Sequence, residues 1–257
     1  MPADKTLATE AGLRLRPQRI ASWPHLAGFL MIGAGVVSFG ILAQHNSGGG
    51  TPAGAGQLAR HTLALPIYLS AIAMDWALLY YCWVGVHRSG GSLKQLSGEI
   101  SWSWKSLAAD LGIVVPFWLV WEGSAWAVHR ILTLGHGLLG SSAAKTVDSL
   151  LPHTLTEVLL WVATSATAGI CEELAFRGYV QRQFHALSGS PAIAILAQGL
   201  IFGLFHAYQG WKNVVVICTL GFLYGALAEW RENLRANIVA HAWSDVWEGW
   251  LKFVLRP

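Results

Sequence analysis

Seven stretches of mostly apolar residues recur along this 257-residue chain. They cover about residues 24–43, 63–86, 106–129, 154–172, 191–208, 212–229 and 236–254. An α-helix needs roughly 20 mostly apolar residues to cross a bilayer. Only 12% of the residues are charged, whereas a soluble domain carries about 25%. The pattern therefore predicts an all-α, polytopic integral membrane protein, a helical bundle with about seven transmembrane helices.

Polar segments suggest three parts in this single membrane domain. Residues 1–23 form a polar segment ahead of the first span, residues 24–150 hold the N-terminal spans and their connectors, and residues 151–257 form a C-terminal core. The first span is too long for a signal peptide, so we expect it to be retained. The net charge of +3 gives no reason to expect a nucleic-acid partner.

The distribution of basic residues predicts the orientation of the chain. If the N-terminus is cytoplasmic, the inside segments hold eleven of the seventeen lysines and arginines: Lys5, Arg14, Arg16, Arg19, Arg88, Lys94, Lys105, Arg177, Arg182, Arg231 and Arg235. This bias agrees with the positive-inside rule. We therefore expect a multi-pass protein of a bacterial-type cytoplasmic membrane, with its N-terminus inside the cell.

Two adjacent carboxylates, Glu172 and Glu173, stand at the end of the fourth apolar run, where an unpaired charge is costly. Helix positions four residues apart share a face, so Glu173 can pair with Arg177. Glu172 points about 100° away, and no cation lies one turn after it. We interpret Glu173 and Arg177 as a structural clamp and Glu172 as the working carboxylate. The alternative is that both acids reach water at the helix end.

Two later spans carry histidines. His206 lies near the end of the fifth run, one turn after Phe202, and the seventh run holds His241 and Asp245 one turn apart. A lone histidine in an apolar helix is more often a hydrogen-bonding partner between helices than a catalytic group. Three separate spans that offer glutamate, histidine, and histidine with aspartate nevertheless predict one convergent site between the C-terminal spans.

The order of these motifs resembles the CAAX protease and bacteriocin-processing family, also called CPBP or Abi-type, of intramembrane endopeptidases. The resemblance rests on E-E-x-x-x-R at Glu172–Arg177, F-x-x-x-H at Phe202–His206 and H-x-x-x-D at His241–Asp245, and it covers about residues 155–250. It implies hydrolysis of a peptide bond in a membrane-bound protein or peptide. Glu172 would be the general base, His206 would help hold the water, and His241 and Asp245 would face the oxyanion.

Asp245 departs from the family pattern, because many relatives carry asparagine at this position. An ionised aspartate cannot donate a hydrogen bond to an oxyanion, so Asp245 is either protonated, a partner that orients His241, or a metal ligand. Glu172, His206 and His241 are plausible zinc ligands that leave a position for water. The H-E-x-x-H signature of zinc proteases is absent, which favours a metal-free mechanism.

Two other functions fit the same residues. Buried glutamates and histidines also form proton relays in transporters, although no inverted repeat is visible in the chain. A non-catalytic membrane scaffold is the third reading, and the intact glutamate and both histidines argue against it. Nothing in the sequence selects a substrate within the family.

The remaining candidates carry less weight. Cys82, Cys171 and Cys218 lie in apolar runs, where we expect buried and inert thiols. Residues 188–191 read as a polar turn between helices and not as a serine protease motif. Further acids within apolar runs are Asp75, Glu122 and Glu157; such groups often line a cavity, and the latter two could equally reach the outer interface.

Overall fold

The described part of the protein is helical throughout, apart from its connecting turns. A computed structural model describes residues 19–46, 57–99, 103–134 and 151–255. The long helices in these ranges are α2 (Trp23–Asn46), α3 (Gln57–Arg88), α5 (Trp104–Leu134), α7 (Leu155–Glu172), α9 (Pro191–Phe205), α10 (Trp211–Arg231) and α11 (Arg235–Val254). Each predicted apolar run lies largely in one of them, which confirms the all-α bundle. The predicted segment 1–23 and the connector before residue 150 lie mostly outside the described residues.

Within the described ranges, five helical segments are long and apolar enough to cross a membrane: Trp23–Leu42, Leu65–Arg88, Trp104–Leu134, Leu155–Ser188 and Trp211–Arg231. Helix α9 is shorter, and α11 is not among the five, because it carries Asp245 and Glu248 with several further polar groups. Large apolar side chains on the spans face outward, such as Phe39 and Leu159, which are 74% and 65% exposed. A surface of this kind suits lipid, and the protein is a multi-pass integral membrane protein.

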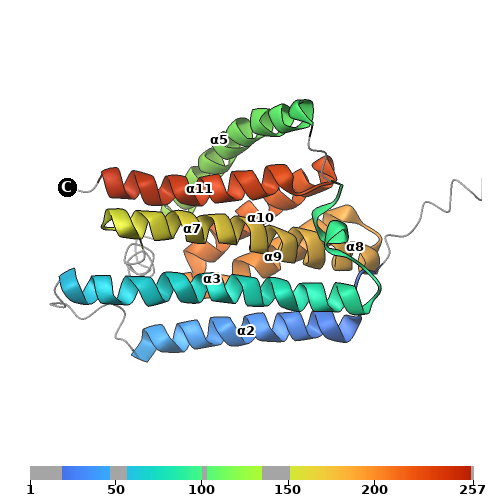
Figure 1. Cartoon of the computed structure of the whole chain (residues 1–257), viewed down its shortest axis with the longest axis horizontal. Coiled ribbons are helices and arrows are strands. Elements are labelled where there is room, and N and C mark those ends of the chain that lie inside the picture. Colours follow the sequence, from blue (N-terminus) through green and yellow to red (C-terminus); the bar gives the residue numbers. More distant parts are fainter. Residues whose placement is uncertain (1–18, 47–56, 100–102, 135–150, 256–257) are drawn as a thin grey trace, which may run out of the picture.

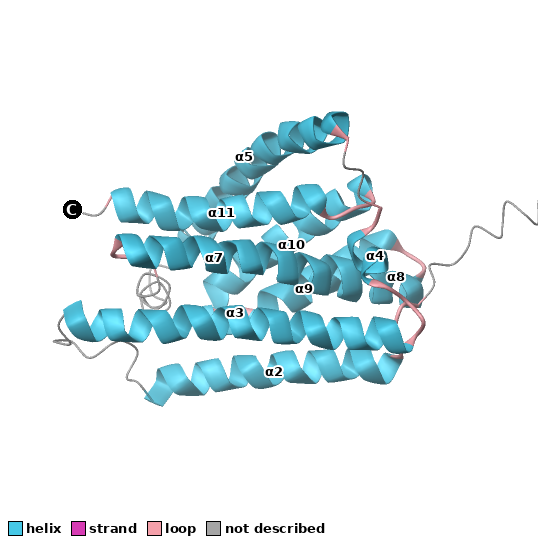
Figure 2. Ribbon diagram, in the orientation of Figure 1, coloured by secondary structure: helices cyan, strands magenta, loops and turns pink. Residues whose placement is uncertain are grey.

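Helix α7 occupies the centre of the bundle (Figure 1). It packs along α3 on one side and along α11 on the other, and α2 lies beyond α3. Helices α9 and α10 form a closely packed pair behind α7, and α5 crosses behind α11 at an angle (Figure 2). The C-terminal end of α7 therefore lies among α3, α9, α10 and α11.

The polar stretch that follows the acidic pair continues the helix of the fourth apolar run. Residues 176–187 look helical from their sequence but are too polar to cross a membrane by themselves. In the structure, α7 continues through a π-helical segment, η1 (Glu173–Gln181), into α8 (Arg182–Ser188). The polar side chains of this continuation are buried inside the bundle, so they do not face lipid: Glu173, Arg177, Gln181 and Gln183 are all 4% exposed or less.

Part of this burial is explained by hydrogen-bond partners at the start of the first described segment, residues 19–46. The Gln183 side chain accepts hydrogen bonds from the backbone N–H groups of Ile20 and Ala21 and donates one to the Ala21 carbonyl. A buried amide needs such partners to offset the loss of its water contacts. The polar residues of η1 and α8 thus hold the segment ahead of α2 against the core.

Candidate active site

The site begins where α7 changes from α-helix to π-helix. Glu172 is the last residue of α7, and Glu173 is the first residue of η1. π-Helical turns are rare, and those inside α-helices are frequently found at functional sites. Here the change falls between the two glutamates, which lie in different environments.

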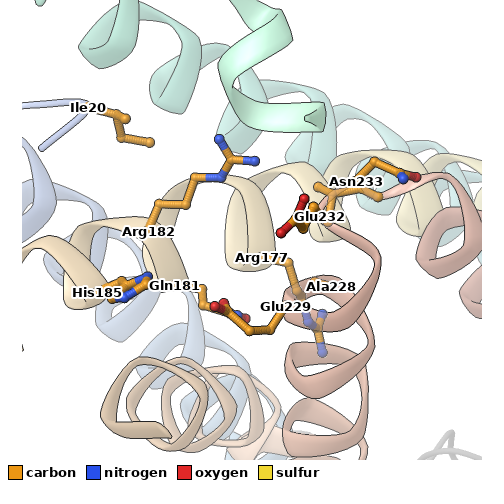
Figure 3. Close-up of a pocket in the computed structure, with 10 residues that line it drawn as sticks. Ile20, Arg177, Gln181, Arg182, His185, Ala228, Glu229, Glu232 and Asn233 are labelled. Atoms are coloured by element: carbon orange, nitrogen blue, oxygen red, sulfur yellow. The ribbon is translucent and has the colours of Figure 1, made fainter. Parts of the chain in front are cut away.

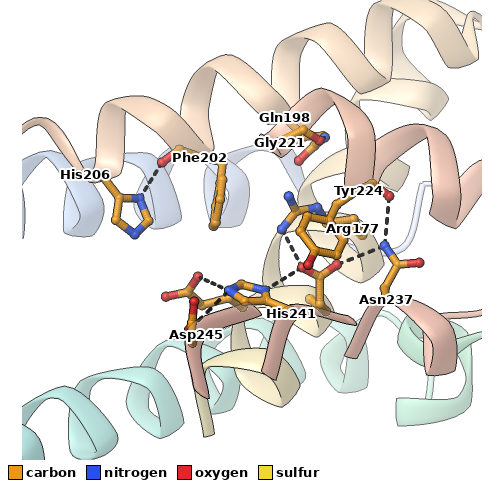
Figure 4. A network of polar contacts seen from close by, with 11 residues as sticks. Arg177, Gln198, Phe202, His206, Gly221, Tyr224, Asn237, His241 and Asp245 are labelled. Carbon is orange, nitrogen blue, oxygen red and sulfur yellow. Dashed lines mark hydrogen bonds and ion pairs between the residues drawn. The ribbon is translucent and has the colours of Figure 1, made fainter. Parts of the chain in front are cut away.

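Glu173 is fully buried and is held by three side chains from two elements. Its Oε1 accepts a hydrogen bond from Arg177 Nη1 at 2.8 Å, which is the ion pair expected from the sequence. Its Oε2 accepts from Asn237 Nδ2 at 3.1 Å, and its Oε1 also lies 2.8 Å from His241 Nδ1. Figure 4 shows this network around Arg177. All of the acid's charge is therefore compensated within the protein, and Glu173 has no free oxygen for a substrate.

Arg177 is fixed by aromatic rings as well as by Glu173. Its guanidinium carbon lies 4.4 Å from the ring centre of Phe202 and 5.2 Å from that of Tyr224. Guanidinium groups stack favourably on aromatic faces, most strongly where water is excluded. Phe202 therefore supports the site by packing against the cation, in line with the supporting position that the F-x-x-x-H motif gives it.

His241 joins the buried network to the open part of the site. Its Nδ1 bonds Glu173, which leaves Nε2 directed towards two other carboxylates. This Nε2 lies 3.7 Å from Glu172 Oε2 and 3.8 Å from Asp245 Oδ2. The Glu172 side chain is 17% exposed and that of Asp245 is 38% exposed, against 0% for Glu173. Glu172 and Asp245 thus keep oxygens available for water or substrate.

His206 lies on the other side of Phe202. Its Nδ1 is 2.8 Å from the Phe202 carbonyl oxygen, so Nδ1 carries the proton that this carbonyl accepts. Its Nε2 is then the nitrogen that remains for water or substrate. The Phe202 ring touches both imidazoles, with centres 4.9 Å from His206 and 6.2 Å from His241. In Figure 4 the His206 ring points from α9 towards the side where Asp245 lies.

The structure brings Glu172, His241 and Asp245 together directly, and it brings His206 to the same region without a direct contact. Among the described residues, no ion pair joins His206 to Glu172 or Asp245. Within the described ranges there is no group of three or more His, Cys, Asp or Glu side chains placed to hold a metal ion. Zinc binding by Glu172, His206 and His241 stays a prediction from the sequence.

Asn237 and Tyr224 take part in the network and were not singled out from the sequence. Asn237 donates to the Tyr224 carbonyl as well as to Glu173, and the Tyr224 ring stacks on His241 with centres 5.4 Å apart. Asn237 lies one turn before His241, as Asp245 lies one turn after it, so helical spacing alone would have identified it. Tyr224 lies on a different helix from His241, so helical spacing does not identify it.

Asp75 and Tyr208 approach the site from elements outside the three motifs. Asp75 on α3 lies near enough to Glu172, His241 and Asp245 to interact with them electrostatically. Tyr208, in the 3₁₀ turn η2 (Ala207–Gln209), interacts in the same way with Glu172, Asp75 and Asp245. The expected role of Asp75 as a residue that lines a cavity stays a prediction.

The other acids and serines lie away from the site. The Glu157 carboxylate accepts a hydrogen bond from the backbone N–H of His153 at 2.7 Å, at the start of α7. Glu122 is exposed on α5. Ser190 is the N-cap of α9 and accepts from the Ile193 N–H, so the turn at residues 188–191 is structural. The three cysteines are buried and free.

A cavity of about 320 Å³ lies at the α8 end of the bundle (Figure 3). It is lined by residues of α8, the end of α10 and the loop after it, including Arg182, Glu229 and Asn233. Arg177 is the one residue of the glutamate network that also lines this cavity, whereas Glu172, His206 and His241 do not. The cavity is therefore separate from the convergent site.

Comparison with known proteins agrees with the position of this site. Residues 154–247 match a family model described as "Type II CAAX prenyl endopeptidase Rce1-like". The matched segment contains α7 through most of α11 and includes all three motifs. No curated protein and no solved structure matches the chain.

Proposed function

We propose that this protein, in which residues 154–247 match the model of Rce1-like type II CAAX prenyl endopeptidases, is an intramembrane endopeptidase that uses Glu172 to activate water. The observation that carries the proposal is the contrast between the two glutamates. Glu173 is buried and compensated by three partners, whereas Glu172 keeps an open carboxylate 3.7 Å from His241 Nε2. A general base needs such an open, unpaired position within reach of water.

In the proposed reaction, Glu172 takes a proton from a water molecule, and the water oxygen attacks the carbonyl carbon of the scissile peptide bond. His206 Nε2 accepts the second hydrogen of this water as a hydrogen bond and so fixes its direction. The carbonyl oxygen becomes an oxyanion in the tetrahedral intermediate. Glu172 then gives its proton to the leaving nitrogen, the C–N bond breaks, and a carboxylic acid and an amine are released.

His241 stabilises the oxyanion in this proposal. Its Nδ1 is held by Glu173, in the same way that a buried carboxylate orients the histidine of a serine protease. The protonated ring then presents Nε2–H to the developing charge. One such fixed donor is worth about 3 to 4 kcal/mol of transition-state stabilisation. Asp245, 3.8 Å from the same nitrogen, orients and stabilises the protonated ring.

The substrate class follows from the family and from the placement of the site. The site lies within helices that face lipid, so a substrate reaches it from the membrane or the membrane surface. We propose a membrane-associated protein or peptide, with processing of the CAAX type. No step of the proposed reaction passes through a metal ion.

The test uses purified protein in liposomes and a farnesylated CAAX reporter peptide that carries a fluorophore and a quencher across the scissile bond. Wild type is expected to cleave it, and Glu172→Gln is expected to lower kcat by about 100-fold or more, since general base catalysis contributes 10²- to 10⁴-fold. Glu122→Gln is the matched control, because Glu122 is an exposed acid on a membrane helix away from the site. Cleavage by Glu172→Gln at the wild-type rate would disprove the assignment.

A second arm of the same assay examines the metal-free mechanism. Chelator present throughout purification and assay is expected to leave the rate unchanged. Loss of cleavage in chelator, with recovery on added Zn²⁺, would contradict the proposed mechanism while leaving the peptidase activity intact.

A further inference from the structure

Asn237 on α11 donates two hydrogen bonds from one amide nitrogen. Its Nδ2 lies 3.1 Å from Glu173 Oε2 and 2.8 Å from the backbone carbonyl oxygen of Tyr224 on α10. Both partners are acceptors, so the amide has to present its NH₂ group to them. The residue is fully buried, and it connects η1 with α10 inside the core. Asn237 is therefore held in one orientation by two separate elements.

The two partners of Asn237 are also the two groups that hold the His241 ring. Glu173 Oε1 bonds His241 Nδ1 at 2.8 Å, and the Tyr224 ring stacks on the imidazole with centres 5.4 Å apart and planes 29° apart. One contact fixes the edge of the ring, and the other covers its face. The dashed lines of Figure 4 join Asn237 to Tyr224 and to the carboxylate beside Arg177. The direction of His241 Nε2 therefore depends on both partners of Asn237 staying in place.

Glu173 needs a contact at each oxygen to keep a single orientation, because the terminal torsion of a glutamate side chain is soft. Its Oε1 takes the bonds from Arg177 and His241, and Asn237 is the partner of Oε2 among the described residues. Asn237 lies one turn before His241 on the same helix, so α11 contacts this carboxylate at two adjacent points. Without Asn237, the carboxylate is free to rotate about its last bond, away from the imidazole.

We propose that Asn237 is a positioning residue of the active site, which directs His241 Nε2 towards Glu172 by fixing the two groups that hold the imidazole ring. The distance from this Nε2 to Glu172 Oε2 is 3.7 Å. Asn237 itself bonds Glu173 and Tyr224, so it acts through the histidine and not on the substrate. The inference rests on the proposed function, because it explains how the donor to the oxyanion is held. Asn237 lies outside the three motifs that carry the resemblance.

Gln198 on α9 offers a matched control for Asn237. Both residues are 0% exposed, and Gln198 Nε2 also donates to an α10 carbonyl, that of Gly221, at 2.6 Å. In the described part of the chain, no hydrogen bond, ion pair or ring contact joins it to Glu173, Tyr224 or His241. Its substitution therefore removes the same kind of buried bond to α10 and leaves the groups around the imidazole untouched.

The first readout is cleavage of the farnesylated CAAX reporter in liposomes, at a temperature where all variants are folded. Asn237→Ala is expected to lower kcat by about 10- to 100-fold with little change in KM, since a small displacement of a catalytic group costs about this much. Gln198→Ala is expected to keep kcat within about threefold of wild type, even where its melting temperature falls as far as that of Asn237→Ala. A purely structural role would lower kcat in both variants in step with their loss of folded protein.

The second readout is the hydrogen bond of His241, which needs no substrate. Protein with isotopically labelled histidine is placed in liposomes for solid-state NMR, and the His241 ring signals are identified by their loss in His241→Ala. In Asn237→Ala the Nδ1–H signal is expected to shift towards that of a weaker hydrogen bond, because the Glu173 carboxylate no longer stays in line with the N–H group. Gln198→Ala is expected to leave this signal at its wild-type position.

Equal losses of kcat per folded protein in Asn237→Ala and Gln198→Ala, a wild-type kcat in Asn237→Ala, or an unchanged His241 signal in Asn237→Ala would each overturn the role of Asn237. Cleavage by Glu172→Gln at the wild-type rate, with the His241 signal shifted in Asn237→Ala, would instead overturn the proposed function alone. If Asn237→Ala does not fold, Asn237→Ser, which keeps one hydroxyl donor, is compared with Gln198→Ser by the same two readouts.

Discussion

At the scale of single residues, Glu172 and Glu173 are chemically identical neighbours that the fold separates into two roles. Glu173 is enclosed by Arg177, Asn237 and His241, and all three contacts are 3.1 Å or shorter. The Glu172 side chain is 17% exposed, and its Oε2 lies 3.7 Å from His241 Nε2. Burial without free oxygens suits a structural acid, whereas partial exposure beside an imidazole suits a reacting one.

Glu173→Gln tests this separation through stability. The substitution leaves the Arg177 cation buried without its counter-charge, and breaking a buried ion pair in this way costs about 3 to 5 kcal/mol. Asn237→Ala removes two hydrogen bonds but no charge, so its cost is expected to be about 1 to 3 kcal/mol. The measurement is the apparent melting temperature and folded yield in detergent. A Glu173→Gln protein as stable as wild type would contradict the clamp.

Part of this residue-level picture could be predicted from the sequence. The Glu173–Arg177 pair follows from helical spacing, because the two residues lie in one continuous helical stretch. The bond between Glu173 and His241 joins residues 68 positions apart, and no local pattern reports which nitrogen of a histidine meets which acid. Asp75 illustrates the same limit, because its partners lie on α7 and α11 and only the packing of α3 brings them close.

At the scale of the elements, the approach of α7 to α11 sets the geometry of the site. A Cβ at Gly169 would lie 2.9 Å from the backbone N of Ala242 and from the carbonyl oxygen of Ile238. Small residues let membrane helices approach closely in this way. Gly169 is one turn before Glu173, and Ala242 follows His241, so the contact directly adjoins the 2.8 Å bond between these two functional residues.

Gly169→Ala is therefore expected to push α7 and α11 apart and to weaken the Glu173–His241 bond. The apparent melting temperature and kcat should both fall, kcat by about 10-fold or more, because small displacements of catalytic groups are costly. Gly123→Ala on α5 is the matched control, since a Cβ there meets no other atom within 4 Å. Its effect on stability should stay within about 1 kcal/mol and favour the helix. Equal behaviour of the two variants would contradict the close-approach argument.

The helices themselves were foreseeable, whereas the continuation of α7 was not. Apolar length predicts each long helix, because the bilayer requires it. The stretch after Glu172 is too polar for that rule to place it in a span. Its polar side chains are instead buried against neighbours such as Ala21 and Gly225, through bonds from Gln183 and Gln181. Hydropathy averages over a helix and cannot report that its polar face is turned inward.

At the scale of the whole molecule, the helix bundle has two opposite ends, and they differ in which helix ends they hold. In Figure 1 the C-terminal end of α3, helix α4 (Leu93–Ser97), α8 and the N-terminal end of α11 all lie at one end of the bundle, and the C-terminus lies at the other. The first of these ends carries Arg88, Lys94, Arg231 and Arg235. An excess of basic residues marks the cytoplasmic side of a membrane protein. We therefore predict that this basic end faces the cytoplasm.

Two single cysteines at exposed positions test the prediction, Ser92→Cys at the basic end and Leu255→Cys at the opposite end. The three native cysteines are buried, so they should add little background to labelling by a maleimide that cannot cross membranes. In intact bacterial cells, Leu255→Cys is expected to react, and Ser92→Cys is expected to react only after the membrane is disrupted. The reverse pattern would invert the orientation. It would also place the Arg182 side of the bundle, with the cavity that it lines, on the outer face, where the positive-inside rule does not predict it.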